Sequence, residues 1–139
     1  METLFTVLHV VAAVFIVGPM AILPMTALRA LRAGHTDQVA VLAKSTRVFT
    51  LLSLVVAVLG FGVLGMSSRS DDLSFSTPWI LASVVLYAGA LAVSLVVVVP
   101  ALQAAAGGAA GSTYGRVAGG SGIVALLLVA VTVLMVWQP

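Results

Sequence analysis

Four long stretches of this chain carry no charged side chain, and their length limits what the chain can fold into. Each runs for about 19 residues or more, and roughly 20 apolar residues in a helix cross the hydrocarbon core of a bilayer. Strands do not reach this length, and an open sheet edge in lipid would leave backbone groups without partners. The pattern predicts an all-α fold, a four-helix transmembrane bundle forming a single domain over residues 1–139. The expected spans are 4–28, 48–66, 78–99 and 117–137.

The composition excludes the soluble and disordered classes of protein. Hydrophobic residues make up 62% of the chain and charged residues 7%, whereas soluble domains are about 45–50% apolar and about 25% charged. The chain has no cysteine, which excludes disulfides, thiolate metal sites and cysteine nucleophiles. Its six basic residues are divided between connections, which is not the clustered pattern of a nucleic-acid-binding protein.

The charges between the spans predict an orientation. Residues 29–47 and 103–116 together hold five basic residues and one acidic residue, whereas the other side holds Arg69 and three acidic residues. Because Lys and Arg collect in cytoplasmic loops, we expect both of these connections to be cytoplasmic and both termini to lie outside the plasma membrane. Trp79 and Trp137 fall at the outer ends of their spans, where aromatic rings favour the lipid interface.

Glycines and prolines predict where the helices bend and end. Gly34 is a typical helix C-terminal stop, and Pro78 suits the first position of a helix. Pro19 and Pro24 lie within the first apolar stretch, and because proline removes a backbone donor we expect them to bend it. Pro100 follows the third apolar stretch and is expected to end that helix.

Two groups of glycines are candidates for close helix packing. Residues 60–65 match a G-x-G-x-x-G pattern, but a dinucleotide fingerprint must follow a strand and open a helix, and this one ends a membrane span. We therefore predict that Gly60, Gly62 and Gly65 let a neighbouring helix approach closely. A second series has four-residue spacing, which predicts either a flat packing ridge on a helix or a flexible connection. It consists of Gly107, Gly111, Gly115 and Gly119.

His9 is an ionisable side chain expected inside a span, which makes it a candidate for function. Its imidazole could ligate haem, bind quinone or relay protons, or it could be a neutral ring bonded to a backbone carbonyl or a partner subunit. Bis-histidine haem needs two ligands, and His35 is expected on the opposite side of the membrane. We therefore expect no cofactor, no metal site and no catalytic residue, with His9 as the sole candidate for cofactor binding.

Other polar groups in the spans are few. No Asp, Glu, Lys or Arg lies inside any expected span, although proton-coupled carriers, ion pumps and voltage sensors depend on such groups. The remaining polar side chains form no cluster in the sequence, so we expect them not to converge and expect no enzyme activity. They are Ser53, Ser83, Tyr87, Ser94 and Thr132.

The first span carries a resemblance to known families. Leu8-His9, the Ala/Val run that follows, Gly18, Pro24 and the arginines Arg29 and Arg32 resemble a family of small bacterial integral membrane proteins with about four spans. A more distant likeness, to the copper-resistance D type and a protoporphyrinogen oxidase type, implies haem binding by His9. This sequence departs from the distant pair because it lacks a second intramembrane histidine and a buried lysine. In size and in its Ala/Gly-rich faces the chain is similar to the accessory subunits of actinobacterial cytochrome bcc–aa3 supercomplexes.

Three functions follow as hypotheses. The first is a non-catalytic accessory subunit of a larger membrane complex, expected to be respiratory, which packs its helices against other integral membrane subunits and lipid. The second is a haem- or quinone-linked redox protein that uses His9. The third is a small oligomeric transporter or channel subunit.

Overall fold

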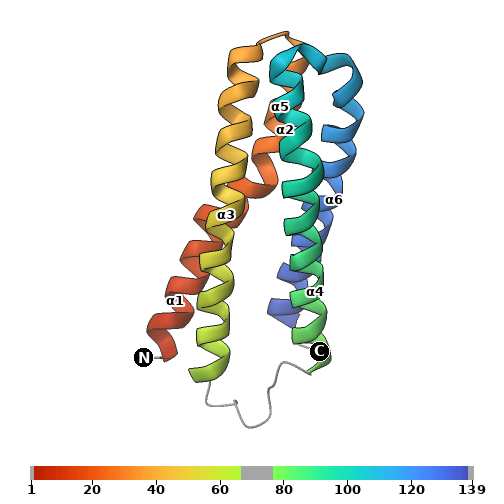
Figure 1. Cartoon of the computed structure of the whole chain (residues 1–139). Helices are drawn as coiled ribbons and strands as arrows, with labels where there is room; N and C mark the ends of the chain where they lie inside the picture. Colours follow the sequence, from red (N-terminus) through yellow and green to blue (C-terminus); the bar gives the residue numbers. More distant parts are fainter. Residues whose placement is uncertain (1, 67–76, 138–139) are drawn as a thin grey trace.

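The computed structural model describes residues 2–66 and 77–137, and the described residues form helices and short turns (Figure 1). Four of its helices are long and apolar enough to cross a membrane, which confirms the predicted all-α, four-helix architecture. The first rod contains α1 (Glu2–Ala12), η1 (Ala13–Val17) and α2 (Gly18–Arg32), and the second is α3 (Thr36–Met66). The third contains α4 (Pro78–Val93), η2 (Ser94–Val98), α5 (Val99–Ala104) and η3 (Ala105–Ala109), and the fourth is α6 (Ala110–Trp137).

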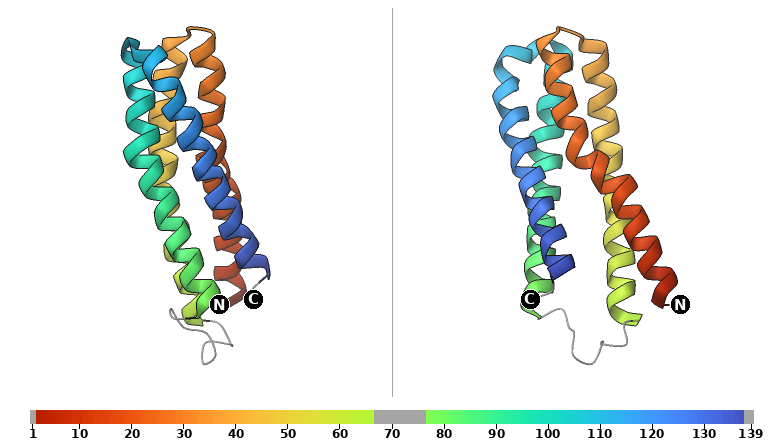
Figure 2. Two further views of the ribbon diagram at one scale, coloured as in Figure 1. Left: turned by 90° about the vertical axis from the view of Figure 1, so that its right-hand side faces the viewer. Right: turned by 180° about the vertical axis from the view of Figure 1, so that it is seen from behind.

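The rods alternate in direction, so the two described ends of the chain lie at the same end of the bundle (Figure 1). We call this the terminal end, and the opposite end, which holds the turn at residues 33–35 and Gly108, the turn end (Figure 2). The predicted connection 67–77, with Arg69, Asp71 and Asp72, lies outside the described residues except for Thr77. The helices extend beyond the expected spans because a span covers only the lipid-embedded part of a helix.

The turn after α2 confirms Gly34 as a helix stop. Gly34 has a φ of 74°, a left-handed conformation in which other residues are strained. Its N–H bonds to the Leu31 carbonyl at 3.2 Å, and the His35 N–H bonds to the Ala30 carbonyl at 3.0 Å. This pair of bonds is a Schellman motif, which satisfies carbonyls at the end of the helix. The chain reverses within three residues as a result.

Two rods contain a wider π-helical turn directly before a proline. The Gly18 N–H bonds to the Ala13 carbonyl before Pro19, and the Val99 N–H bonds to the Ser94 carbonyl before Pro100. The first rod changes direction there, as expected from its prolines (Figure 2). The predicted stop at Pro100 is wrong, because the helix continues past this proline as far as the kink at Gly108. The wider turn gives the proline ring room that a regular α-helical turn does not provide.

The second glycine series is divided by a sharp kink. Gly108 has a φ of 107°, so the direction of the chain reverses there, near the end of η3. The predicted connection 103–116 is therefore helical on both sides of one glycine. The segment contains a kink and the start of a helix, and both the packing ridge and the flexible connection stay predictions.

The rods pack unevenly along the bundle. Near the turn end α2 contacts α3 and α6, and α5 contacts α3 and α6. Near the terminal end α1 packs on α3, and α4 packs on α6 (Figure 2). The largest fully buried apolar side chains include Met20, Leu102, Val39, Val98, Val117 and Val124.

Candidate functional site

His9 joins α1 to α3 through the backbone of α3. Its Nδ1 lies 2.9 Å from the carbonyl oxygen of Val56. Because a carbonyl only accepts hydrogen bonds, Nδ1 must carry the proton in this contact. The half-buried imidazole is thus bonded to a backbone carbonyl, one of the roles that the sequence left open for it.

Gly60 makes this bond possible. A Cβ atom at position 60 would lie 2.8 Å from the His9 Cε1, closer than real Cβ atoms approach, and 3.3 Å from its Nδ1. In a helix, the carbonyl of residue 56 points along the axis toward residue 60. The imidazole therefore reaches the Val56 oxygen through space that any side chain at position 60 would occupy.

Gly62 on α3 leaves room for the aromatic ring of Phe5. Phe5 lies on α1, the same helix as His9. A Cβ atom at position 62 would lie 3.1 Å from the Phe5 Cδ1, and Phe5 and His9 are four residues apart, on one face of α1. A Cβ at Gly65 would meet no heavy atom within 4 Å. Gly60 and Gly62 thus lie at the α1–α3 contact, whereas a packing role for Gly65 stays a prediction.

The Nδ1 bond decides which nitrogen of neutral His9 could bind a ligand. With Nδ1 protonated, Nε2 holds the free lone pair, and a histidine that ligates a metal often bonds its other nitrogen to a backbone carbonyl. His35 is exposed in the turn at the opposite end of the bundle. Within the described ranges, no group of three or more His, Cys, Asp or Glu residues could hold a metal ion.

A second set of polar side chains meets between α3 and the third rod. The Thr50 hydroxyl donates to the Thr46 carbonyl at 2.7 Å and lies 2.9 Å from the Ser94 hydroxyl oxygen. Since Thr50 has a single hydroxyl hydrogen, Ser94 must be the donor in the second bond. The π-helical turn η2 begins at Ser94, so this bond joins the middle of the third rod to α3.

A similar pair lies nearer the terminal end. The Ser53 hydroxyl donates to the Thr50 carbonyl, and the Tyr87 hydroxyl lies 2.6 Å from the Ser53 oxygen. The same reasoning makes Tyr87 the donor to Ser53. We call Thr46, Thr50, Ser53, Tyr87 and Ser94 the hydroxyl seam.

The hydroxyl seam corrects one prediction. We expected the polar groups of the spans not to converge, but Ser53 and Ser94 are fully buried and bonded across two rods. The partners of each bond lie 34 and 44 residues apart in the sequence, so only the tertiary structure brings them together. Ser83 and Thr132 instead bond to carbonyls of their own helices.

Thr46 differs from the rest of the hydroxyl seam. Its side chain is fully buried, and its Oγ1 has no hydrogen-bond partner among the described residues. A buried hydroxyl without a partner costs about 1–3 kcal/mol. The seam therefore has one position with unused hydrogen-bonding capacity.

Three glycines of the second series point away from the described part of the bundle. A Cβ at Gly107, Gly115 or Gly119 would meet no heavy atom of the described residues within 4 Å, and Gly111 lies outside the residues whose surroundings are described. The close approach of α6 to the third rod occurs instead at Gly120, where a Cβ would lie 2.8 Å from the Val98 Cγ2. The sequence analysis missed Gly120, although it adjoins the series that it selected.

Comparison with known proteins places the chain in a family. No curated protein and no solved structure matches it. A family model described as "Predicted integral membrane protein (DUF2269)" matches residues 3–139, nearly the whole chain. The family description agrees with the four apolar helices of the bundle. The chain therefore belongs to the DUF2269 family of predicted integral membrane proteins.

Proposed function

We propose that this chain is a non-catalytic accessory subunit of a larger membrane protein complex, and that it acts by packing its helices against other integral membrane subunits. The observation that carries the proposal is the outward face of α6. Gly115, Gly119 and Gly122 follow one helical stripe, and a Cβ at any of them would meet nothing within 4 Å. Small residues at this spacing let two helix backbones approach closely in lipid. A helix that uses this stripe has to come from another chain.

The polar groups inside the bundle support the same proposal. His9 is bonded to Val56, and four of the five seam hydroxyls are bonded to one another or to α3 carbonyls. These groups are neutral alcohols and one imidazole, and three of their five bonds join different helices of the same chain. Most of their hydrogen-bonding capacity is thus used for holding the bundle together.

Co-purification from native membranes tests the proposal. The tagged chain is extracted in a mild detergent, and its companions are identified by mass spectrometry. Companions that are integral membrane proteins, recovered in fixed ratio, are expected with the wild type. The variant G115L/G119L should lose them, and Ala92→Leu, which places a leucine at an exposed position on α4, should retain them. Equal recovery with all three chains would contradict the proposal.

A respiratory assembly is the first complex to examine, because the chain is similar in size and composition to accessory subunits of such assemblies. Deletion of the chain should lower the yield of intact oxidase or supercomplex from membranes. The optical spectra of the haem centres that remain should be unchanged. An unchanged yield would remove the respiratory part of the proposal and leave the packing role.

The second candidate is a haem- or quinone-linked redox role for His9. The observation that favours it is the Val56 bond to Nδ1, which leaves Nε2 as the nitrogen with a free lone pair. The purified chain would then show visible absorption that His9→Ala abolishes. A colourless wild-type chain would exclude haem.

The third candidate, an oligomeric transporter or channel subunit, is favoured by the hydroxyl seam and the unpaired Thr46 hydroxyl. Solute flux in liposomes above that of empty vesicles, reduced by Thr46→Val, would support it. Flux equal to that of empty vesicles would argue against it.

A further inference from the structure

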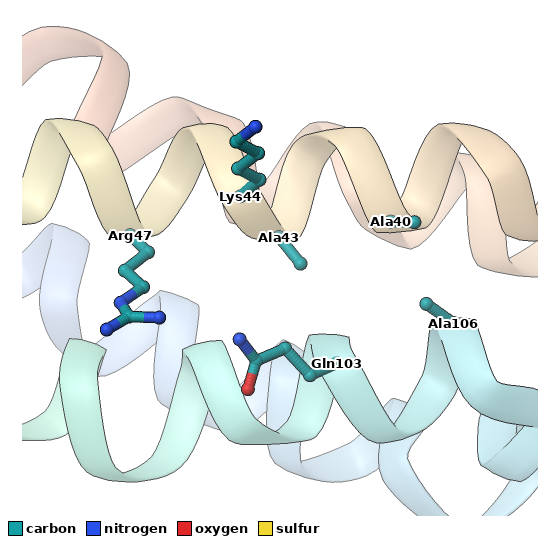
Figure 3. A pocket seen from close by; sticks show the side chains of 6 residues that line it. All are labelled: Ala40, Ala43, Lys44, Arg47, Gln103 and Ala106. Carbon is teal, nitrogen blue, oxygen red and sulfur yellow. The ribbon is translucent and has the colours of Figure 1, made fainter.

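A hollow of about 280 Å³ lies between α3 and the third rod near the turn end (Figure 3). Three alanines, Ala40, Ala43 and Ala106, line it together with Lys44, Arg47 and Gln103. A single water needs only about 10–15 Å³ measured in this way, so the hollow has room for a polar group of several atoms. Small side chains on both helices leave the space, and long polar side chains border it.

The polar side chains that line the hollow all carry hydrogen-bond donors. The Arg47 guanidinium points from α3 toward α5, where Gln103 lies across from it, whereas the Lys44 side chain extends from α3 away from α5 (Figure 3). The lining thus offers a guanidinium and an amide, with an ammonium on a flexible four-carbon stem at its edge. None of the described lining residues is acidic. Asp37 lies in the first turn of α3, about 10 Å along the axis from Lys44 at the usual helical rise. This chemistry favours an anion that accepts several hydrogen bonds, such as a phosphate group.

The position of the hollow along α3 favours a lipid phosphate. Residues 48–66 follow Arg47 without a charge, and a helical stretch of this length crosses the hydrocarbon core. Arg47 then lies at the border of the core, and Lys44 and Ala40 lie one to two turns farther out, among the headgroups. On the lipid side, Leu51 and Leu54 are exposed and lie four and seven residues after Arg47, on the same face of the helix.

We infer that this hollow binds the phosphate of an anionic phospholipid headgroup, with Lys44 and Arg47 as the charged donors, Gln103 as a neutral donor, and an acyl chain along Leu51 and Leu54. Basic pockets between transmembrane helices are typical headgroup sites. The inference does not rest on the proposed assembly role.

Native mass spectrometry of the purified chain in detergent tests this site. The chain is titrated with phosphatidylglycerol and with phosphatidylcholine of the same acyl chains, and separately with inorganic phosphate. The test variant is K44Q/R47Q. The control variant, R29Q/R116Q, removes the same number of charges from the same end of the bundle but changes no residue that lines the hollow.

Wild-type and control chains should bind phosphatidylglycerol about thirtyfold more tightly than phosphatidylcholine, since each of the two cation contacts is worth about 1 kcal/mol. K44Q/R47Q should bind the two lipids equally. Inorganic phosphate could displace the lipid and bind with the same dependence on Lys44 and Arg47. This result would support a phosphate site but overturn the lipid as the source of the phosphate. No lipid preference in the wild type, or an equal loss in both variants, would overturn the site.

Discussion

The imidazole of His9 occupies the space that a Cβ atom on Gly60 would fill. A Cβ there would come within 2.8 Å of the His9 Cε1, and the ring uses this space to bond to the Val56 carbonyl at 2.9 Å. The imidazole on α1 and the glycine on α3 thus form one contact between the two helices. Substitutions at such contacts between helices should therefore change the free energy of unfolding.

Replacement of Gly60 by valine should lower the free energy of unfolding by about 1–3 kcal/mol, the usual cost of overpacking. The cause is displacement of His9 and loss of its bond to Val56. Unfolding in mixed micelles, followed by circular dichroism, measures the change. Gly65→Val is the control, because a Cβ there meets nothing within 4 Å.

The pairing of His9 with Gly60 also predicts coupling between the two positions. In H9A/G60V the valine no longer meets the imidazole, so the loss of stability should be smaller than the sum of the two single losses. Additive losses would show that the two residues act independently.

Within the hydroxyl seam, Thr46 and Thr50 should respond differently to the same change. Thr50→Val removes the acceptor of Ser94 and the donor to the Thr46 carbonyl, and should cost about 1 kcal/mol, as for other hydrogen bonds between membrane helices. Thr46→Val removes a hydroxyl that has no partner among the described residues, so stability should be unchanged or higher. A large loss for Thr46→Val would indicate a bound water or ligand at that oxygen.

Leucine substitutions at two adjacent glycines of α6 should differ in their effect on the stability of the isolated chain. Gly120→Leu forces a side chain against Val98 and should destabilise the isolated chain by about 1–3 kcal/mol. Gly119→Leu adds the same side chain where a Cβ meets nothing within 4 Å, and should leave the unfolding free energy within about 0.5 kcal/mol. Thermal unfolding of both variants checks this. The opposite order would mean that α6 is rotated about its axis relative to this account.

The expected orientation can be mapped directly because the chain has no cysteine. Thr3→Cys lies near the terminal end and His35→Cys lies in the turn at the other end, and both positions are exposed. A membrane-impermeant maleimide should label Thr3→Cys in intact cells and His35→Cys only after permeabilisation. The reverse pattern would invert the orientation predicted from the basic loops.

Much of the fold could be predicted because the signals are local. The absence of charge over each span predicts a membrane helix, and Gly34 stops α2 through its own backbone conformation. Pro100 shows the limit of local reasoning. A proline usually ends a helix, but the preceding π-helical turn admits it, and that turn has no signal in the sequence.

The hydroxyl seam could not be predicted because helices that are apolar on every side do not indicate which face is buried. Ser94 and Thr50 are isolated polar residues in long apolar stretches, and their bond depends on how each rod is rotated about its axis. The same lack of a polar face explains why the contact of Gly120 with Val98 could not be predicted. His9 could be singled out as unusual, but its partner is a backbone carbonyl, which every residue has.

The mass of the particle that contains this chain tests the central claim most directly. Native membranes are extracted in a mild detergent, and the particle is sized by mass photometry, with its subunits then identified. The account predicts a particle well above the 14.1 kDa of one chain plus its micelle, containing other integral membrane subunits in fixed ratio. A particle that contains only copies of this chain, at any stoichiometry, would contradict it.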